Sequence, residues 1–501
     1  MRNTDYSNAI DYLYGLQKYG IKFGLDNTIR LLALLGNPQD SFKSIHIAGT
    51  NGKGSTSAMI ASILRAAGLK VGLFTSPHLV SFTERIRVDG VEITEKEVVE
   101  LTKEIRDVVF RSQKLEVRSQ NIEHDTRHSS LVTRYPLSPT FFEFVTAMAF
   151  LYFKRRGVGW AVVETGMGGR LDATNVITPA VSVITNISYD HREFLGETLK
   201  EIAMEKAGII KKKVPVVSAR QEDEAEEVIC RTARERSSHL FIYEKDFRGT
   251  LRSSGIDGIT FDYIDDSCII KDLHIPLAGE HQLSNACLAI KASLITLKSS
   301  SELQVTSNKS SLVTAVKNSS LIREGLAITK WPGRLELIRN AKAMVDVLID
   351  GAHNPSASEV LAQALRKFYI PSYREIILIL GIMADKDIEG IMRPLLPLAS
   401  RVIMTAPGYE RAAHPSRLAE CACSLGYHAD IADSVEEAIG MAIRNSNKLQ
   451  VTGRQAGKPI SQPPEYFDPL LIVIAGSFYT TGEAKMVLGQ ESNCPSLAGL
   501  R

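Results

Sequence analysis

The 501-residue chain is 44% hydrophobic and 23% charged, which is ordinary for a globular protein and gives room for roughly two to four domains. Its net charge of +2, from 59 basic and 57 acidic side chains, argues against a strongly basic nucleic-acid-binding protein. Its six cysteines are too few for a disulfide scaffold, and no apolar run reaches the roughly 18 residues of a membrane span, so we expect no membrane partner.

Short apolar strands alternate with helical patterns in the first half of the chain. This alternation predicts an α/β fold with mostly parallel sheets. The predicted strands are residues 44–48, 71–74, 160–164 and 181–185, and the predicted helices are residues 55–67, 197–207 and 279–297.

The composition changes after residue 298, where serines accumulate. We predict a linker or insertion at about 299–320, a short helix near 321–326, and two domains that comprise residues 1–328 and 329–501. Polar inserts stand out at 113–139 and 446–469, and the prolines of the second insert predict a surface loop. The second series has predicted strands at 344–349, 376–380, 401–405 and 470–475, and helices at 355–368, 388–396, 415–425 and from 479.

A glycine-rich turn, GTNGKGS at residues 49–55, follows the first predicted strand and opens the first long helix. Backbone N–H groups in such a turn, together with a helix N-terminus, can bind phosphate. Lys53 is placed to contact the β- and γ-phosphates, and the hydroxyl of Ser55 to approach a phosphate-bound Mg²⁺. The turn departs from G-x-x-x-x-G-K-[ST], because Ile47 replaces the first glycine and Gly54 precedes Ser55.

Two carboxylates lie at the ends of buried-looking strands. Glu164 ends the strand 160–164 and Asp350 follows the strand 344–349. Open α/β sheets bind ligands at the carboxyl ends of their strands, and Mg²⁺ prefers oxygen ligands. Glu164 is therefore a candidate metal ligand, and Asp350 is expected to face a cleft.

The helix predicted at 197–207 has a lysine on its apolar face. Leu199, Ile202 and Ala203 have i, i+3, i+4 spacing, and Lys206 at i+7 shares their face. An inward lysine must be paired, extend its amine to solvent from the last helical turn, or be modified. The pattern leaves these alternatives open.

The turn GTNGKGS resembles the phosphate-binding loop of the Mur ligase superfamily, in its folate branch of dihydrofolate synthases and folylpolyglutamate synthases. Similar motifs follow in the order of that family over nearly the whole chain, which makes the resemblance specific. They are FTSPHL (74–79), ERI (84–86), ETGMGGRLDATN (164–175), DH (190–191), EKAG (205–208), GEHQ (279–282), PGR (332–334) and DGAHNP (350–355).

The resemblance implies an N-terminal P-loop-containing Mur-ligase-like ATPase domain and a smaller C-terminal Rossmann-like domain. It also implies functional residues. The ATP-binding residues would be Gly52, Lys53, Gly54, Ser55, Asn285, Arg334 and Asp350, with Asp350 at the ribose and Arg334 at phosphate. The metal ligands would be Ser76, Glu164 and His191. The catalytic residues would be Lys53, His191 and Lys206.

Lys206 would be carbamylated in that family, which gives it a negative charge suited to a site with metal ions. Weaker matches imply substrate contacts at Lys22, Phe23, Gly24, Leu25 and Phe142. The implied cofactor is Mg²⁺, with ATP as co-substrate, and a monovalent cation is a further candidate.

The implied activity is ATP-dependent ligation. The γ-phosphate of ATP passes to the carboxylate of 7,8-dihydropteroate, and the amine of L-glutamate then displaces phosphate to give dihydrofolate. Asn51 favours this reaction, or a bifunctional enzyme, because eukaryotic polyglutamate synthases of the family tend to carry lysine there. The alternative is a folylpolyglutamate synthase, or a bifunctional enzyme, that adds glutamate to tetrahydrofolate.

Two other classes fit less well. A GTP-binding switch protein predicts an N-K-x-D motif after a later strand, but residues 186–191 read N-I-S-Y-D-H. A cell-wall Mur ligase predicts G-K-T-T in place of G-K-G-S. We expect a monomer that acts on small molecules. Because the N-terminal segment has neither a signal-peptide core nor a clear transit peptide, we expect the protein in the cytoplasm or a mitochondrion.

Overall fold

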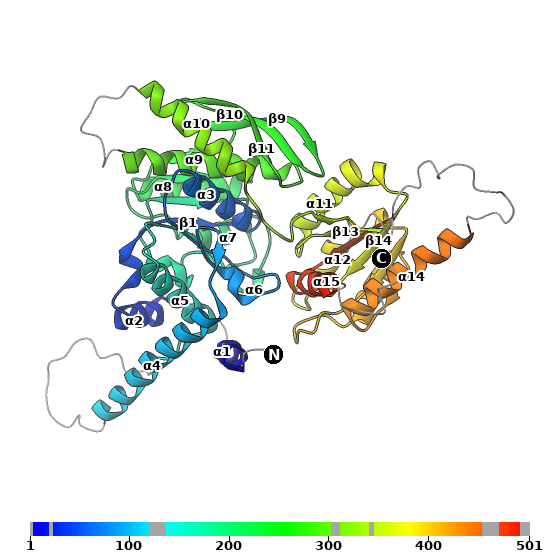
Figure 1. Cartoon of the computed structure of the whole chain (residues 1–501), viewed down its shortest axis with the longest axis horizontal. Helices are drawn as coiled ribbons and strands as arrows, with labels where there is room; N and C mark the ends of the chain where they lie inside the picture. Colours follow the sequence, from blue (N-terminus) through cyan, green and yellow to red (C-terminus); the bar gives the residue numbers. More distant parts are fainter. Residues whose placement is uncertain are drawn as a thin grey trace.

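The computed structural model contains two neighbouring α/β units (Figure 1). Its described strands form an eight-stranded, a three-stranded and a six-stranded sheet. Most strand pairs in the two larger sheets are parallel, which confirms the predicted fold class. The described residues are 4–19, 24–120, 137–301, 311–339, 345–452 and 470–490.

The eight-stranded sheet is built around β1 (Lys43–Ala48). This strand pairs in parallel with β5 on one side and with β6 on the other, so that Ile45 lies opposite both Val162 and Val181. The strand order is β4-β3-β2-β5-β1-β6-β7-β8, and among these strands only the pairs β2–β3 and β3–β4 are antiparallel. The remaining strands are β2 (Val71–Phe74), β3 (Ile86–Val88), β4 (Val91–Glu92), β5 (Trp160–Glu164), β6 (Val181–Ile184), β7 (Val216–Ser218) and β8 (Leu240–Ile242).

Helices cover both faces of this sheet. One of them, α5 (Phe141–Arg155), is apolar nearly all round because it is buried in the core. It starts with a capping box, in which Thr140 and Glu143 bond each other's backbone N–H groups. The other helices of the unit are α1 (Thr4–Gly15), α2 (Asp26–Leu34), α3 (Lys53–Ala66), α4 (Glu95–Gln120), α6 (Arg192–Leu195), α7 (Leu199–Ala207), α8 (Asp223–Glu235), α9 (His281–Ser301) and α10 (Ser311–Ala327).

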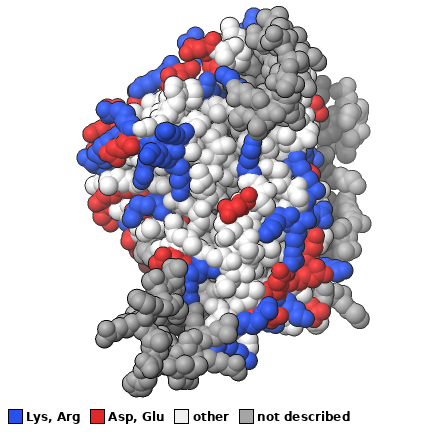
Figure 2. All heavy atoms as spheres, turned by 90° about the vertical axis from the view of Figure 1, so that its left-hand side faces the viewer, with Lys and Arg blue, Asp and Glu red and all other residues white. Residues whose placement is uncertain are grey.

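Within the described part of the chain, no helix combines the length and the apolarity needed to cross a bilayer. Figure 2 shows the face of the first unit that points away from the second. On its visible part, Lys and Arg side chains lie beside Asp and Glu side chains around the rim. This mixture agrees with the small net charge of the chain.

The three-stranded antiparallel sheet was not expected from the sequence. It consists of β9 (Phe247–Gly255), β10 (Gly258–Asp265) and β11 (Ile269–Ile275). Phe261 and Tyr263 bury its inner face in the core that β1 and α3 share.

Both ends of the segment 299–320, which the sequence marked as a linker or insertion, are helical. Helix α9 continues to Ser301 and α10 already begins at Ser311, whereas residues 302–310 lie outside the described residues. Tertiary packing explains the longer helix, because Ile322 and Leu326 are buried on the side of α10 that contacts α3. Such packing overrides the low helix propensity of serine. The domain boundary at 328/329 falls between α10 and β12 and stays a prediction.

The six-stranded sheet has the order β12-β13-β17-β14-β15-β16, in which only β12 pairs antiparallel to its neighbour. Apolar clusters cover both of its faces, as expected for a Rossmann-like layer. Its strands are β12 (Glu336–Ile338), β13 (Val345–Ile349), β14 (Glu375–Leu380), β15 (Arg401–Met404), β16 (Asp430–Ile431) and β17 (Leu470–Ala475). Its helices are α11 (Pro355–Ala364), α12 (Ile388–Met392), α13 (Pro415–Ser424), α14 (Val435–Thr452) and α15 (Phe478–Gln490).

The polar inserts begin as helices. Helix α4 runs to Gln120 and α14 runs to Thr452, so each extends into a segment that the sequence marked as an insert. Residues 121–136 and 453–469 lie outside the described residues.

The loops at the carboxyl ends of parallel strands meet where the two units touch. The turn after β1 contacts the loop after β13 through Asn51 and Asn354, and the loop after β6 contacts the loop after β14 through Asp190 and Lys386. Ligands of open α/β sheets bind at such ends. The fold therefore brings two ligand-binding edges together.

Candidate active site

The glycine-rich turn at residues 49–52 connects β1 to α3, which begins at Lys53. Gly52 has φ +89°, and a Cβ atom there would lie 2.3 Å from Oδ1 of Asn285, so only glycine fits. The Nζ atom of Lys53 donates to the carbonyl oxygens of Gly49 and Thr50 at 3.2 and 3.1 Å. The lysine thus lies over its own turn, at the N-terminus of a 14-residue helix.

Two further segments, helix α9 and the connection that contains Trp331, surround the start of α3. A Cβ atom on Gly54 would lie 2.6 Å from the ring of Trp331, which belongs to the connection between the two units. Ser55 is buried and 3.5 Å from the side-chain nitrogen of Gln282 in α9. Asn285, one turn further along α9, donates to Gln282 at 3.0 Å. The sequence-predicted nucleotide residues Gly52, Lys53, Gly54, Ser55 and Asn285 therefore lie together.

Glu164 ends β5 beside the loop that follows β2. Its Oε2 atom accepts a 3.3 Å hydrogen bond from the backbone N–H of Ser76, and only 3% of the residue is exposed. Burial raises the pKa of Glu164 to about 7, against the opposing charges of Lys53, Arg334 and Arg85. A buried carboxylate with a single long hydrogen bond is a suitable ligand for a cation.

His191 interacts with a different carboxylate. Its backbone N–H donates to Oδ1 of Asp190 at 2.9 Å, and its Nε2 atom lies 3.9 Å from Oδ2. Burial lowers the pKa of His191 to about 4, although Asp190 opposes the shift. Among the described residues, no three His, Cys, Asp or Glu side chains gather as a metal site. A cation near Glu164 and Ser76 would therefore take further ligands from phosphate and water.

Lys206 lies in the last turn of α7 with its amine in the interior, which confirms the inward orientation predicted from helical spacing. It is 3% exposed, and its Nζ atom donates to the carbonyl oxygen of Gly49 at 2.8 Å. Burial, aided by the charge of Lys53, lowers the pKa of Lys206 to about 7. A large fraction of this amine is therefore neutral near neutral pH.

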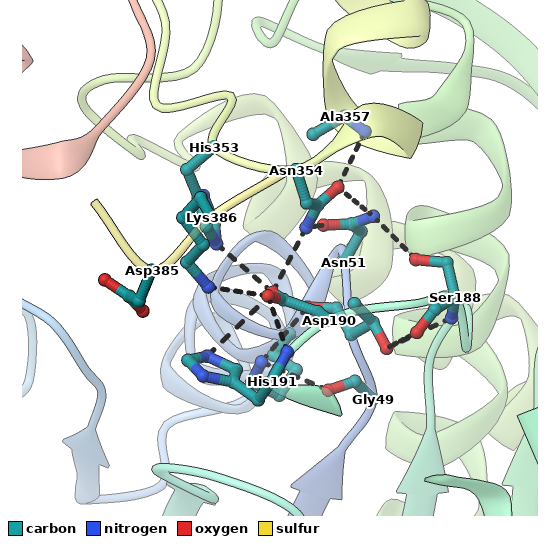
Figure 3. A network of polar contacts seen from close by, with 12 residues as sticks. Gly49, Asn51, Ser188, Asp190, His191, His353, Asn354, Ala357, Asp385 and Lys386 are labelled. Atoms are coloured by element: carbon teal, nitrogen blue, oxygen red, sulfur yellow. Dashed lines mark hydrogen bonds and ion pairs between the residues drawn. The ribbon is translucent and has the colours of Figure 1, made fainter. Parts of the chain in front are cut away.

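Asp190 joins the two units (Figure 3). Its carboxylate lies 2.6 Å from Nζ of Lys386 and 3.6 Å from Nε2 of His353, and it accepts a 3.2 Å hydrogen bond from Asn354. Burial opposes ionisation of Asp190, but the hydrogen bond from His353 and the nearby positive charges hold its pKa well below the ordinary value. The sequence did not single out Lys386. The available signal was its position in A-D-K-D, just beyond strand β14.

Arg334 and Asp350 approach the same site from the second unit. The guanidinium of Arg334 lies 4.6 Å from the ring centroid of Phe478, and its charge acts on both Glu164 and Asp350. Both carboxylate oxygens of Asp350 accept backbone N–H groups, from Leu335 at 2.8 Å and Ala352 at 2.9 Å. Asp350 therefore holds the segment after Arg334 against the end of β13.

Phe142 lies beside the loop that follows Glu164. Its ring stacks on Phe74 at 5.8 Å, and a Cβ atom on Gly166 would lie 2.5 Å from it. Gly24 has φ +143° and Leu25 is the N-cap residue of α2. Lys22 and Phe23 lie outside the described residues.

The sequence matches known proteins over most of its length. Residues 128–293 match the Mur ligase middle domain, and residues 333–451 match the Mur ligase glutamate ligase domain. Folylpolyglutamate synthase of Lacticaseibacillus casei is 33% identical over 452 residues, which cover 90% of this chain and 96% of that protein. The chain belongs to the folate–glutamate ligases of the Mur ligase superfamily.

Other folate–glutamate ligases agree with this assignment. Dihydrofolate synthase/folylpolyglutamate synthase of Bacillus subtilis is 35% identical, with 82% of this chain and 87% of that protein covered. The structure of Mycobacterium tuberculosis folylpolyglutamate synthase complexed with ADP and AMPPCP has a TM-score of 0.80 and 32% identity, and the match covers 97% and 99% of the two chains. The protein is therefore an ATP-dependent ligase, which excludes the GTP-binding switch protein.

Proposed function

We propose that this folate–glutamate ligase joins L-glutamate to 7,8-dihydropteroate. The observation that carries the proposal is the environment of Asn51 in the glycine-rich turn. Its side-chain amide donates to Ser188 at 3.2 Å, and its Oδ1 atom accepts from Asn354 at 3.1 Å. The lysine that eukaryotic polyglutamate synthases tend to carry here could not accept the hydrogen bond from Asn354.

The nucleotide would bind at the start of α3. Backbone N–H groups of the turn would receive the phosphates, and Lys53 would exchange the carbonyl oxygens of Gly49 and Thr50 for the β- and γ-phosphates. Asn285 would contact the nucleotide, while Arg334 and Asp350 would approach phosphate and ribose from the second unit. Closure of the two units would complete the site.

Glu164 and Ser76 would hold Mg²⁺ together with phosphate and water, and His191 would become a further ligand by turning from Asp190 toward the ion. The ion would neutralise charge on the transferring phosphate. The substrate carboxylate attacks the γ-phosphorus and ADP leaves. The glutamate amine then attacks the acyl carbon, phosphate leaves and the amine loses a proton. Catalysis by this chain would consist of positioning and charge stabilisation.

Lys206 would act as a carbamate. Its amine is buried and its pKa is lowered to about 7, so a neutral amine is available to add CO₂ with release of one proton. The resulting anion would sit beside cationic groups that an ammonium would repel. The segment that contains Lys22, Phe23, Gly24 and Leu25 would contact the pterin end of the substrate, and Phe142 would contact the substrate from another segment.

A parallel assay tests the choice of substrate. The purified protein receives ATP, Mg²⁺ and L-glutamate, with dihydropteroate or tetrahydrofolate as acceptor, and the products are separated chromatographically. We expect efficient formation of dihydrofolate. Efficient extension of tetrahydrofolate with dihydropteroate untouched would instead identify a folylpolyglutamate synthase, and comparable rates would identify a bifunctional enzyme.

A further inference from the structure

Arg85 is a buried cation at the boundary between the two units. It ends the short helix Phe82–Arg85 and is only 7% exposed. Its Nε atom donates to Nδ1 of His78 at 2.7 Å, and its guanidinium carbon lies 5.4 Å from the ring centroid of Phe141. Among the described residues, no carboxylate is close enough to form an ion pair with it. A buried guanidinium without an anion is costly.

The nearest acidic side chains are already engaged. Glu84 accepts the backbone N–H groups of Leu79, Val80 and Ser81 at 2.8–2.9 Å. Glu164 accepts the backbone N–H of Ser76. Neither carboxylate neutralises Arg85 by direct contact.

A chain of hydrogen bonds fixes which protons remain available at this site. Because arginine only donates, Nδ1 of His78 is the acceptor and its Nε2 atom carries the proton of the neutral ring. That N–H donates to the Tyr14 oxygen at 3.2 Å. The hydroxyl hydrogen of Tyr14 is then left for another acceptor. In the described part of the chain, the two terminal nitrogens of Arg85 also have no hydrogen-bond partner.

The second unit closes the other side of this group. Helix α15 packs on the loop after β2, where a Cβ atom on Gly482 would lie 2.0 Å from the carbonyl oxygen of Leu79. Tyr479 of α15 stacks on Tyr409 with 4.0 Å between ring centroids. Burial raises the pKa of Tyr479, and the charge of Arg85 partly offsets the rise. Arg85 therefore lies between the units, near both Tyr479 and Glu164.

We propose that Arg85 and the hydroxyl of Tyr14 bind the α-carboxylate of a glutamyl group, an assignment that rests on the proposed ligase function. The two terminal nitrogens of arginine match the two oxygens of a carboxylate. The carboxylate comes either from free L-glutamate or from the glutamyl end of a reduced folate. Pteroate has only the carboxylate that reacts.

Steady-state kinetics of Arg85→Gln test the proposal. ADP release is measured at varied L-glutamate and at varied acceptor, with dihydropteroate and with tetrahydrofolate. We expect the KM for the glutamyl ligand to rise about tenfold or more, the KM for ATP to be unchanged, and Tyr14→Phe to give a smaller rise. Arg65→Gln is the matched control, because Arg65 donates to the carbonyl oxygen of Asp89 in the same unit.

The arms distinguish the two sources. A higher KM for L-glutamate with either acceptor identifies free L-glutamate, whereas a higher KM for tetrahydrofolate alone identifies the glutamyl end of a folate. Unchanged KM values for both overturn the proposal, as does a loss confined to kcat. Failure to use dihydropteroate would refute the proposed function but leave the tetrahydrofolate arm intact.

Thermal melting separates binding from folding. Because Arg85 is buried without an anion, Arg85→Gln should melt no lower than the wild type. Arg85→Lys provides a folded variant that keeps the positive charge but lacks the paired terminal nitrogens of arginine. L-glutamate with ATP should raise the Tm of the wild type and not that of Arg85→Gln. An equal shift in both proteins would contradict the assignment.

Discussion

Replacing Glu164 by glutamine should change how stability depends on pH. The pKa of this carboxyl is raised from 4.5 to about 7 by burial, so between these pH values the unfolded chain ionises it and the folded chain does not. The wild type should therefore lose stability as pH rises through this window. At 1.36 kcal/mol per pKa unit, the loss amounts to about 3 kcal/mol.

Glutamine has nearly the same shape and does not ionise. The difference in unfolding free energy between Glu164→Gln and wild type should grow by about 3 kcal/mol from pH 4.5 to pH 7. The altered hydrogen bond to Ser76 shifts the unfolding free energy by the same amount at every pH, so it does not affect the pH dependence of the difference. The titration of histidines also cancels, because both proteins contain them. The series stops at pH 7, because the lowered pKa of Lys206 brings a second titration above that value.

Urea denaturation of the metal-free protein, in the presence of a chelator, provides the measurement. Glu97→Gln serves as a control of opposite sign. Burial opposes ionisation of Glu97, but hydrogen bonds from Thr94 and the charge of Arg156 lower its pKa, so its contribution to stability is present at high pH and lost as pH falls. Parallel stability curves for wild type and Glu164→Gln would refute the reasoning.

Three further changes test the rest of the site. Lys53→Ala should lower kcat/KM while the protein stays folded, and the decrease should correspond to about 3–5 kcal/mol of lost transition-state stabilisation. Near-wild-type ligation by this variant would contradict the phosphate role of Lys53. Lys206→Arg and Lys206→Ala should both be inactive, and a small carboxylic acid in solution should restore part of the activity of Lys206→Ala. Full activity of Lys206→Arg in CO₂-depleted buffer would exclude a carbamate. Lys386→Met leaves the Asp190 carboxylate buried and should cost about 3–5 kcal/mol in chemical denaturation, with partial recovery when Asp190→Asn is added; additive effects would argue against the ion pair.

Local patterns predicted the parts of the site that lie within one element and its adjoining turn. Residues 44–55 contain an apolar strand, glycines and a helical pattern, and these appear as β1, the glycine-rich turn and α3. The spacing of Ile202 and Ala203 placed Lys206 inside in the same way. Such features depend on neighbours fewer than eight residues away.

Contacts between distant elements were not predictable from these patterns. Asp190 and Lys386 are separated by 196 residues, and the angle at which the two units dock decides whether they meet. Helix α10 was underestimated because its stability comes from burial of Ile322 and Leu326 against α3 rather than from local preference. The antiparallel strands β9–β11 had a detectable signal, since apolar residues alternate around Phe261 and glycines flank the turn at 255–258. The many polar residues of β9 made this alternation hard to recognise.

The contact between Trp331 and Gly54 gives the protein an optical reporter. The chain has two tryptophans, and the other, Trp160, is buried in β5 with Lys43 over its ring. In a Trp160→Phe background, all indole emission would come from Trp331, which lies against the start of α3 and has the guanidinium of Arg87 5.7 Å from its ring centroid. Fluorescence of that single ring would follow the occupancy of the turn and the rotation of the second unit in real time, without a label.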